Sequence, residues 1–348
     1  MPSLDSVTFR GAAAALVTRG HRAAYDETPV EGELPKVPTM RRKIRAALVT
    51  VGLLAAVHAN AQDLDPRAYV HAPINSTVAI VGFSYSSGSV LTDPTLPVTN
   101  VDATLNTPSV GVARVFNLFG KTAQALAALP YSWAEVTGEI NEQAARTTRS
   151  GLSDMRLRLS VLVAGAPAMG LRELAKAPRK PIVGVSLTAS PPTGQYYPQK
   201  FINLGTNRWA FKPEVALSYP LGRKWLADVY AAAWLFTANE AFYPGTARRT
   251  QDRVRALQAH VSYSFTPKTW VAFNSTWYGG GQAEVDGIPT GSNLSSTRVG
   301  ATLGFPVGRR HAVKVAYSTG AIVRFGANFN TLSVAWQTGW FDKPAAKR

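Results

Sequence analysis

Hydrophobic and polar residues alternate along many segments of this chain. Between Arg255 and Phe265, every second position from Leu257 onward is apolar or aromatic, and the positions between them are polar or small. This period of two predicts a β-strand with one apolar face, because a helix would spread the same polar side chains around its whole circumference. The alternation recurs in 155–163, 207–219 and 297–305. The sequence therefore predicts strands that each have an apolar and a polar side.

Twelve such strands are predicted. They lie near 77–87, 104–116, 121–137, 152–163, 180–191, 207–219, 224–237, 254–265, 269–279, 297–306, 311–319 and 328–340. Strands of this length can cross a bilayer when they are tilted. After residue 61 no apolar run approaches the roughly 20 residues of a membrane-spanning helix. A closed barrel is then the way for this chain to span a membrane, because it pairs every backbone polar group.

The links between the predicted strands alternate in length. Tight links rich in Gly, Pro or basic residues follow strands two, six, eight and ten, and much longer links follow strands one, three, five, seven and nine. The exception is 164–179, where Ala166 to Ala177 is expected to form a short helix. Short turns on one side and long loops on the other are typical of outer-membrane proteins. The predicted fold class is therefore all-β: a transmembrane antiparallel β-barrel of about twelve strands, with short periplasmic turns and long extracellular loops.

Tryptophans lie near the ends of several predicted strands. We expect Trp225, Trp270 and Trp340 at the turn side and Trp133 and Trp277 at the loop side, as in the aromatic girdles of membrane barrels. The alternative is a soluble β-sandwich that buries the same rings in its core. Long continuous apolar faces, opposed by faces rich in Ser, Gly and Thr, favour the barrel.

The N-terminal part of the chain predicts export. Residues 40–61 combine a basic start, an apolar run from Ala46 to Val57 and small residues before Gln62, the layout of a secretory signal peptide cleaved near Ala61. Residues 1–39 have no sustained periodicity and are interpreted as a gene-model extension or an unstructured leader. Residues 62–341 would form the barrel, and 342–348 a short tail after Phe341. The predicted location is the outer membrane of a Gram-negative bacterium, and Gln62 to Ser76 is left open as a plug or a linker.

Composition removes several classes of function. The 348 residues include 37 Lys and Arg, 21 Asp and Glu and no cysteine, which excludes disulfides, thiolate metal sites and a cysteine nucleophile. The basic residues are scattered without interleaved exposed aromatics, so nucleic acid is not expected as a partner. After residue 61 the histidines are His71, His260 and His311, and they show no metal-binding spacing. His260 lies among serines, and its interpretation as a polar interior residue is favoured over a catalytic one. No cofactor, metal or enzymatic activity is predicted.

Five short segments are distinctive. They are Asp65-Pro-Arg-Ala-Tyr, Gly88-Ser-Val-Leu-Thr-Asp-Pro, Leu129-Pro-Tyr-Ser-Trp, Gly151-Leu-Ser-Asp and Asn203-Leu-Gly-Thr-Asn-Arg-Trp-Ala-Phe-Lys-Pro-Glu. Together they resemble the outer-membrane transporters associated with the meta-cleavage pathway of phenol degradation, over about residues 62–341. The resemblance implies a barrel that admits aromatic or other small organic solutes. It brings no site residues with it.

The polar faces of the predicted strands carry an excess of positive charge. The residues expected to face the lumen are Arg156, Arg158, Arg208, Lys212, Glu214, Asp228, His260, Arg298 and Lys314. Such a lumen would lower the barrier for anions and raise it for cations, which suits aromatic carboxylates or phenolates. Alternatively, these groups pair with carboxylates and plug the barrel, since a twelve-stranded lumen can be open or filled.

Two further functions stay open from the sequence. One is a non-conducting structural barrel whose Arg248, Arg249 and Arg253 bind the phosphates of lipopolysaccharide. The other is a channel for hydrophobic solutes with a lateral exit through its wall. In each case the expected partners are outer-membrane lipid and lipopolysaccharide, the barrel-insertion machinery and, for a channel, small organic solutes.

Overall fold

The computed structural model describes residues 64–90, 98–140, 143–200, 202–290, 292–308, 310–323 and 327–342. The predictions for residues 1–39, for the signal peptide at 40–61 and for the tail beyond Asp342 lie outside these residues.

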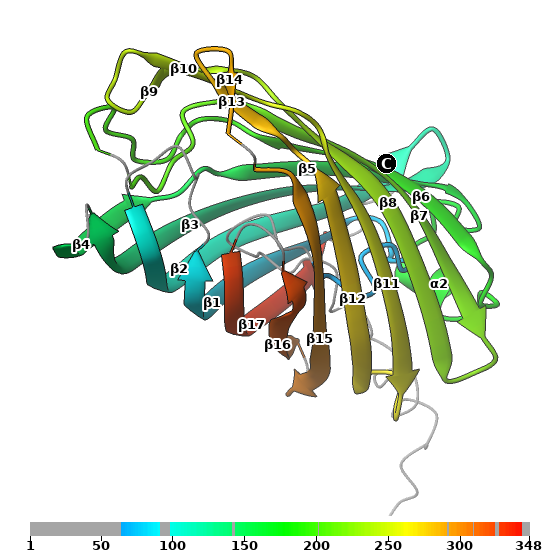
Figure 1. Cartoon of the computed structure of the whole chain (residues 1–348). Coiled ribbons are helices and arrows are strands. Elements are labelled where there is room, and N and C mark those ends of the chain that lie inside the picture. Colours follow the sequence, from blue (N-terminus) through cyan, green and yellow to red (C-terminus); the bar gives the residue numbers. More distant parts are fainter. Residues whose placement is uncertain are drawn as a thin grey trace, which may run out of the picture.

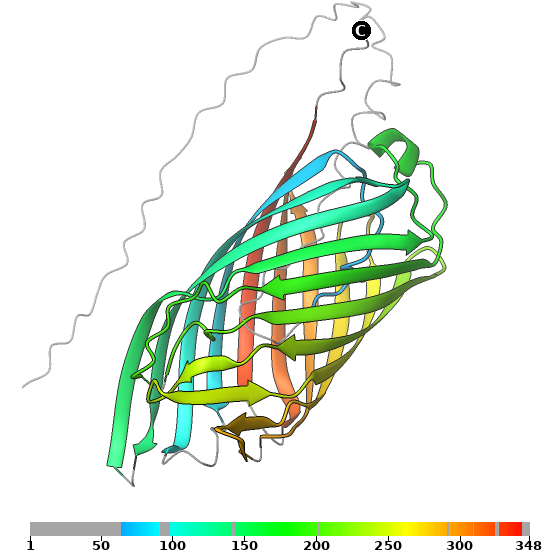
Figure 2. The same cartoon turned by 90° about the horizontal axis from the view of Figure 1, so that it is seen from above.

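The described strands form a closed antiparallel barrel (Figure 1). Its wall is built from β1 (Ser76–Val90), β2 (Val98–Leu118), β3 (Lys121–Ile140), β4 (Gln143–Leu152), β5 (Arg156–Ala164), β6 (Ile182–Ser190), β7 (Ala210–Leu221), β8 (Trp225–Phe236), β11 (Val254–Ser264), β12 (Trp270–Gly280), β15 (Leu294–Val307), β16 (His311–Val323) and β17 (Ala327–Phe341). Sequential strands pair with one another, and β1 closes the barrel by pairing with both β2 and β17. The strands run obliquely around the barrel (Figure 2). The predicted fold class is confirmed.

One wall position is shared by two strands. β4 pairs with the second half of β3, from Tyr131 to Ile140, and β5 pairs with its first half, from Ala123 to Ala128. The two strands therefore count as one position, which gives the barrel the twelve predicted positions. The prediction placed the start of this strand at residue 152 and treated 143–151 as loop, which was wrong. Residues 143–151 contain two Arg and two Thr and lack apolar alternation. Backbone pairing with β3 and an ion pair between Arg146 and Glu135 extend the wall there.

The outer face of the wall is apolar, as the alternation predicts. On β11 the side chains of Leu257 and Val261 are 49% and 44% exposed, whereas Gln258 and His260 are 2% and 1% exposed. The same pattern holds on β5, β7, β15 and β17, whose outward Leu, Val and Trp side chains are exposed. Apolar surface in contact with water costs roughly 25 cal/mol per Å², so a belt of this kind is stable only against lipid.

The expected aromatic girdle needs one correction. Trp133, Trp225, Trp277 and Trp340 are between 41% and 49% exposed and face outward. Trp270 was placed in the same girdle, but it is only 1% exposed and faces the interior. Its partner across the strand pair is Gly304, whose missing side chain leaves the space that the indole ring occupies.

The two ends of the barrel differ. The turn end carries the tight β2–β3, β7–β8, β11–β12 and β15–β16 links, and the β5–β6 link there contains the one short helix of the described residues, α2 (Leu171–Leu174). At the loop end, β9 (Asn239–Phe242), β10 (Ala247–Gln251), β13 (Ala283–Val285) and β14 (Ile288–Pro289) form a separate small sheet (Figure 1). These segments were predicted as loops, and their polar, Gly- and Pro-containing sequences hide the pairing. No helix within the described ranges is long and apolar enough to cross a membrane.

Candidate functional site

Residues 64–75, here called the N-terminal segment, lie inside the barrel. The segment, blue in Figure 2, runs back from the start of β1 into the interior at the turn end. The backbone N–H groups of Ile74 and Asn75 donate to the carbonyls of Met169 and Val115, 2.9 Å away in each case. Leu64, Ala68 and Tyr69 are buried, and Tyr69 is 0% exposed. The sequence left open whether this stretch is a plug or a linker, and in the structure it occupies the lumen as a plug would.

Tyr69 reaches a carboxylate at the centre of the barrel. Its hydroxyl donates to Glu214 Oε1 on β7 over 2.8 Å and lies 2.8 Å from Ser186 Oγ on β6. Burial raises the pKa of the Tyr69 hydroxyl above its usual range, so the group stays protonated and acts as the donor. The contact ties the N-terminal segment to the barrel wall.

Glu214 also gathers the predicted lumen cations around it. Lys212 Nζ lies 3.1 Å from Oε2, and Arg158 Nη2 lies 3.3 Å from Oε1. Gln258 Nε2 donates to the same carboxylate over 3.2 Å. A buried charge needs such partners, because an isolated carboxylate in a low-dielectric interior is strongly destabilising. Two positive charges are therefore largely committed to one structural carboxylate.

The wall makes room for the segment at a glycine. Tyr69 lies directly against Gly184 on β6, and a Cβ atom at that position would overlap the tyrosine ring. Tyr69 also packs edge-on against Tyr230, with ring centroids 5.1 Å apart, in a small apolar cluster that includes Leu162 and Ile182. The segment is thus seated in a shaped recess as well as held by polar contacts.

Two further charge contacts link the N-terminal segment to the wall. Lys314 Nζ on β16 forms an ion pair with Asp65 over 2.7 Å, and the lysine is 4% exposed. The backbone N–H of Arg67 donates to Asp228 Oδ2 over 3.2 Å, and its Nη2 donates to Ser264 Oγ over 2.6 Å. Of the nine predicted lumen residues, Arg158, Lys212, Glu214, Asp228 and Lys314 therefore belong to one network around this segment.

The predicted residues nearer the loop end are arranged differently. Arg208 and Arg298 are 8% and 3% exposed, and neither forms an ion pair with a carboxylate among the described residues. Arg208 donates to Gln251 and stacks over the Phe236 ring at 4.2 Å. Arg298 donates to the carbonyl oxygen of Phe329 over 2.6 Å. Their charges are held by neutral partners.

The last two predicted residues have other surroundings. His260 Nδ1 lies 2.9 Å from Asn274 Oδ1, and Asn274 donates in turn to Thr302, which makes a polar chain across β11, β12 and β15. The ring thus contacts an amide, not the serine hydroxyl that the catalytic interpretation requires. Arg156 is half-buried at the start of β5, on the same face as Arg158. Within the described ranges no group of three or more His, Asp or Glu side chains is arranged to hold a metal ion.

Sequence reasoning missed the residues that fill the lumen. Asp65, Arg67 and Tyr69 precede the first strand and belong to no alternating pattern. They do form the first of the five distinctive segments, so a signal was present without an assigned role. The prolines at 66 and 73 also argue against a strand there, which points to a segment that packs on the wall without joining it.

Comparison with solved structures supports the same architecture. An outer membrane channel from Pseudomonas putida F1 superimposes with a TM-score of 0.70 at 21% identity, covering 80% of this chain and 100% of that chain. Weaker likenesses include the KdgM porin, with a TM-score of 0.41, 7% identity and coverage of 74% and 98%. The transport unit of the autotransporter AIDA-I from Escherichia coli has a TM-score of 0.46, 10% identity and coverage of 80% and 93%. The first likeness shows that the fold is that of an outer membrane channel. No curated protein matches the chain.

A family profile matches most of the barrel. The profile covers residues 72–338, from the end of the N-terminal segment to the last strand, which is well over half of the chain. Its extent agrees with the resemblance seen in the distinctive segments of the sequence. The chain belongs to the family described as "Putative MetA-pathway of phenol degradation".

Proposed function

We propose that this protein is a channel in the outer membrane of a Gram-negative bacterium for small organic solutes, aromatic or anionic, which diffuse passively through a weakly basic lumen. The chain would reach that membrane after export and cleavage near Ala61, with the barrel-insertion machinery, lipid and lipopolysaccharide as partners. The turn end would then face the periplasm and the loop end the exterior.

The observation that carries this proposal is an arginine in the loop half of the lumen that stacks on an aromatic ring and has no carboxylate partner. The Arg208 guanidinium lies 4.2 Å from the centre of the Phe236 ring, and it forms no ion pair with a carboxylate among the described residues. A positive charge that has only neutral partners keeps its attraction for an anion, and a neighbouring ring offers apolar contact to an aromatic solute. These groups would draw aromatic carboxylates or phenolates from outside.

The N-terminal segment limits what could pass. It fills the turn half of the lumen and is held there by Glu214, Asp228 and Lys314. Passage would then be confined to small solutes and to the space beside the segment. A narrow path surrounded by like charges favours ions of the opposite sign.

Planar-bilayer recording tests the proposal directly. With a salt gradient across the membrane, we expect a small conductance and a reversal potential that indicates preference for anions. The variant Arg208→Gln should reduce that preference without unfolding the barrel. The matched control is Arg255→Gln on β11, because the Arg255 side chain is exposed on the outer face of the barrel and its loss should leave the preference unchanged. Cation preference in the unmodified protein would overturn the proposed preference of the lumen for anions.

The filled turn half favours a second candidate, a non-conducting structural or lipopolysaccharide-binding barrel. The absence of any conductance in the same recording would support it. Its expected binding residues are Arg248, Arg249 and Arg253. Arg248 already forms an ion pair with Glu240 over 3.0 Å at the surface, which lowers the charge it offers to phosphate. For this reason the channel is preferred.

A further inference from the structure

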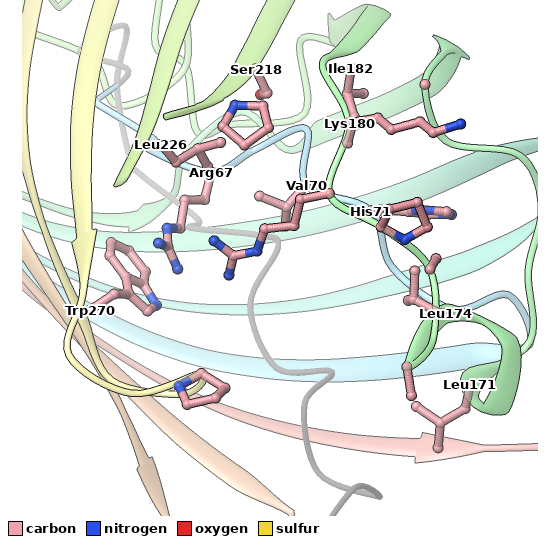
Figure 3. A pocket seen from close by; sticks show the side chains of 17 residues that line it. Arg67, Val70, His71, Leu171, Leu174, Lys180, Ile182, Ser218, Leu226 and Trp270 are labelled. Atoms are coloured by element: carbon pink, nitrogen blue, oxygen red, sulfur yellow. The ribbon is translucent and has the colours of Figure 1, made fainter. Parts of the chain in front are cut away.

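A cavity of about 470 Å³ lies at the turn end, between the N-terminal segment and the β5–β6 link (Figure 3). Its lining includes Arg67, Val70 and His71 of the segment and Leu171 and Leu174 of α2. Its volume is within the range of about 300–1,000 Å³ that is usual for sites that bind small molecules. The cavity lies where a solute that had passed the segment would leave the barrel.

Most of the surface that lines this cavity is apolar. Ile182, Leu226 and the leucines of α2 contribute aliphatic side chains, and Trp270 contributes a flat aromatic ring. In Figure 3, Trp270 and Arg67 lie at one end of the cavity, and His71, Leu171 and Leu174 lie at the other. An apolar lining with a ring at one end fits a small aromatic molecule better than a sugar or a hydrated ion.

The charged groups that line the cavity are all cationic. They are Arg67, Arg179 and Lys180, and the lining contains no Asp or Glu. Arg179 Nη1 donates to the carbonyl oxygen of Arg223, and Arg67 Nη2 donates to Ser264, so both guanidinium groups are fixed by neutral partners. Burial lowers the pKa of Arg67 to about 10, which leaves it charged at neutral pH. The Asp228 carboxylate outside the lining opposes this shift, and the positive charge of Arg179 adds to it.

Two buried donors at this end have no partner among the described residues. Trp270 is 1% exposed, and its Nε1–H donates to no atom of the structure, nor does Nε–H of Arg67. The Arg67 guanidinium lies 4.7 Å from the centre of the Trp270 ring, and the ring nitrogen is on the cavity side of that ring (Figure 3). A carboxylate oxygen of a ligand could accept hydrogen bonds from these unsatisfied donors, and the neighbouring guanidinium would attract its negative charge.

We propose that this cavity is a binding site for an aromatic carboxylate, a periplasmic exit site in which the carboxylate meets Arg67, Arg179 and the Trp270 indole N–H while the ring packs on Leu171, Ile182 and Leu226. The proposal rests on the channel function, because it names the solute class that leaves the lumen. It adds a site to which the solute binds with a measurable affinity, and passive diffusion through a channel does not require such binding.

Titration calorimetry on the full chain folded in detergent tests the site, with benzoate as the probe and benzyl alcohol as its neutral counterpart. We expect benzoate to bind about tenfold more tightly than benzyl alcohol, since a carboxylate accepts charge-assisted hydrogen bonds from the guanidinium groups and the neutral alcohol does not. Arg179→Gln should remove most of this difference. Trp270→Phe keeps a ring but loses the N–H and should weaken benzoate binding about threefold.

Arg223→Gln is the matched control, because it removes the same charge at the same end of the barrel but its side chain does not line the cavity. It should bind benzoate like the unmodified protein. Heat-dependent gel migration of each variant verifies that the barrel is folded. The proposal is overturned if benzoate fails to bind the unmodified protein, or if Arg179→Gln and Arg223→Gln behave alike.

Conductance of the same preparations separates this proposal from the channel function. A protein that conducts anions but does not bind benzoate would overturn the exit site alone. A protein that binds benzoate through Arg179 but does not conduct would support the site and overturn the channel.

Discussion

The turn half and the loop half of the barrel interior hold their charges in opposite ways. From the turn end to the centre of the barrel, Lys314 is paired with Asp65, and Arg158 and Lys212 share Glu214. In the loop half, Arg208 and Arg298 contact an amide oxygen and a backbone carbonyl oxygen. Both halves contain buried cations on the wall strands, but only those of the loop half have no carboxylate partner among the described residues.

This difference teaches that the number of lumen charges does not decide how a barrel acts on a solute. A cation that is paired with a buried carboxylate contributes to the folded structure and has little field left for a passing ion. A cation with neutral partners keeps that field. Among the predicted lumen residues, the buried cations without an ion pair to a described carboxylate are therefore Arg208 and Arg298 in the loop half.

The largest effect should come from emptying the turn half. Replacement of Asp65–Ala72 by a Gly-Ser stretch of equal length removes the side chains that fill the lumen and should raise the single-channel conductance several-fold. The matched control replaces Ala283–Pro289 at the loop end, which belongs to the small external sheet and should leave conductance near that of the unmodified protein. Equal conductance in all three proteins would show that the N-terminal segment does not limit passage.

The next largest effect is expected from Glu214→Gln. The amide still accepts from Tyr69 but leaves Arg158 and Lys212 without a buried counter-charge, which should lower the free energy of unfolding by about 3 kcal/mol. Denaturant unfolding of the refolded barrel measures this. Arg208→Gln in the loop half removes a charge with neutral partners and should cost less than about 1 kcal/mol. Similar losses in the two variants would contradict the contrast between the halves.

A smaller and more local effect should follow from Gly184→Ala. The new Cβ atom overlaps the Tyr69 ring, so the ring must move and its hydrogen bond to Glu214 must lengthen or break. We expect a modest rise in conductance with little loss of barrel stability. Gly304→Ala crowds Trp270 in the same way and should instead weaken benzoate binding in the exit cavity. If Gly184→Ala leaves conductance unchanged, the recess at β6 does not hold the segment in place.

Much of the fold could be predicted from sequence because alternation reports burial directly. On β11 and β15, one face must meet lipid and the other must not, so the pattern appears in every second residue. The start of β4 could not be found in this way. Gln143–Leu152 extends the wall through backbone hydrogen bonds with β3 and one ion pair between Arg146 and Glu135, and neither imposes an apolar alternation on the sequence.

The interior could be predicted only in part. Alternation placed Glu214 and Lys212 on the inner face, but their partner Tyr69 lies about 145 residues earlier in a segment without periodicity. Pairing between such distant groups depends on the closed barrel and on the space left by Gly184. Trp270 was assigned to the membrane boundary for a related reason, since its position near a strand end fits a girdle equally well. Only the register with Gly304 shows that the ring turns inward.

The smallest predicted effect concerns the pH dependence of the turn half. Burial lowers the pKa of His71 below its usual value, although its hydrogen bond to the Pro167 carbonyl oxygen opposes this shift. The charged groups that line the same cavity are Arg67, Arg179 and Lys180. The neutral ring is thus the form that fits the folded protein.

The sign of the effect follows from that preference. Because the folded protein binds the His71 proton less readily than the unfolded chain, the contribution of this residue to stability is full above about pH 6.5 and is lost as the pH falls below it. The thermal midpoint of the unmodified barrel should therefore fall slightly more between pH 8 and pH 5 than that of His71→Gln, which carries no titratable ring. His311→Gln at the start of β16, outside the cavity lining, is the control for a histidine elsewhere at the turn end. If the thermal midpoints of His71→Gln and the unmodified protein respond identically to pH, the stability of the barrel does not depend on the charge of the His71 ring.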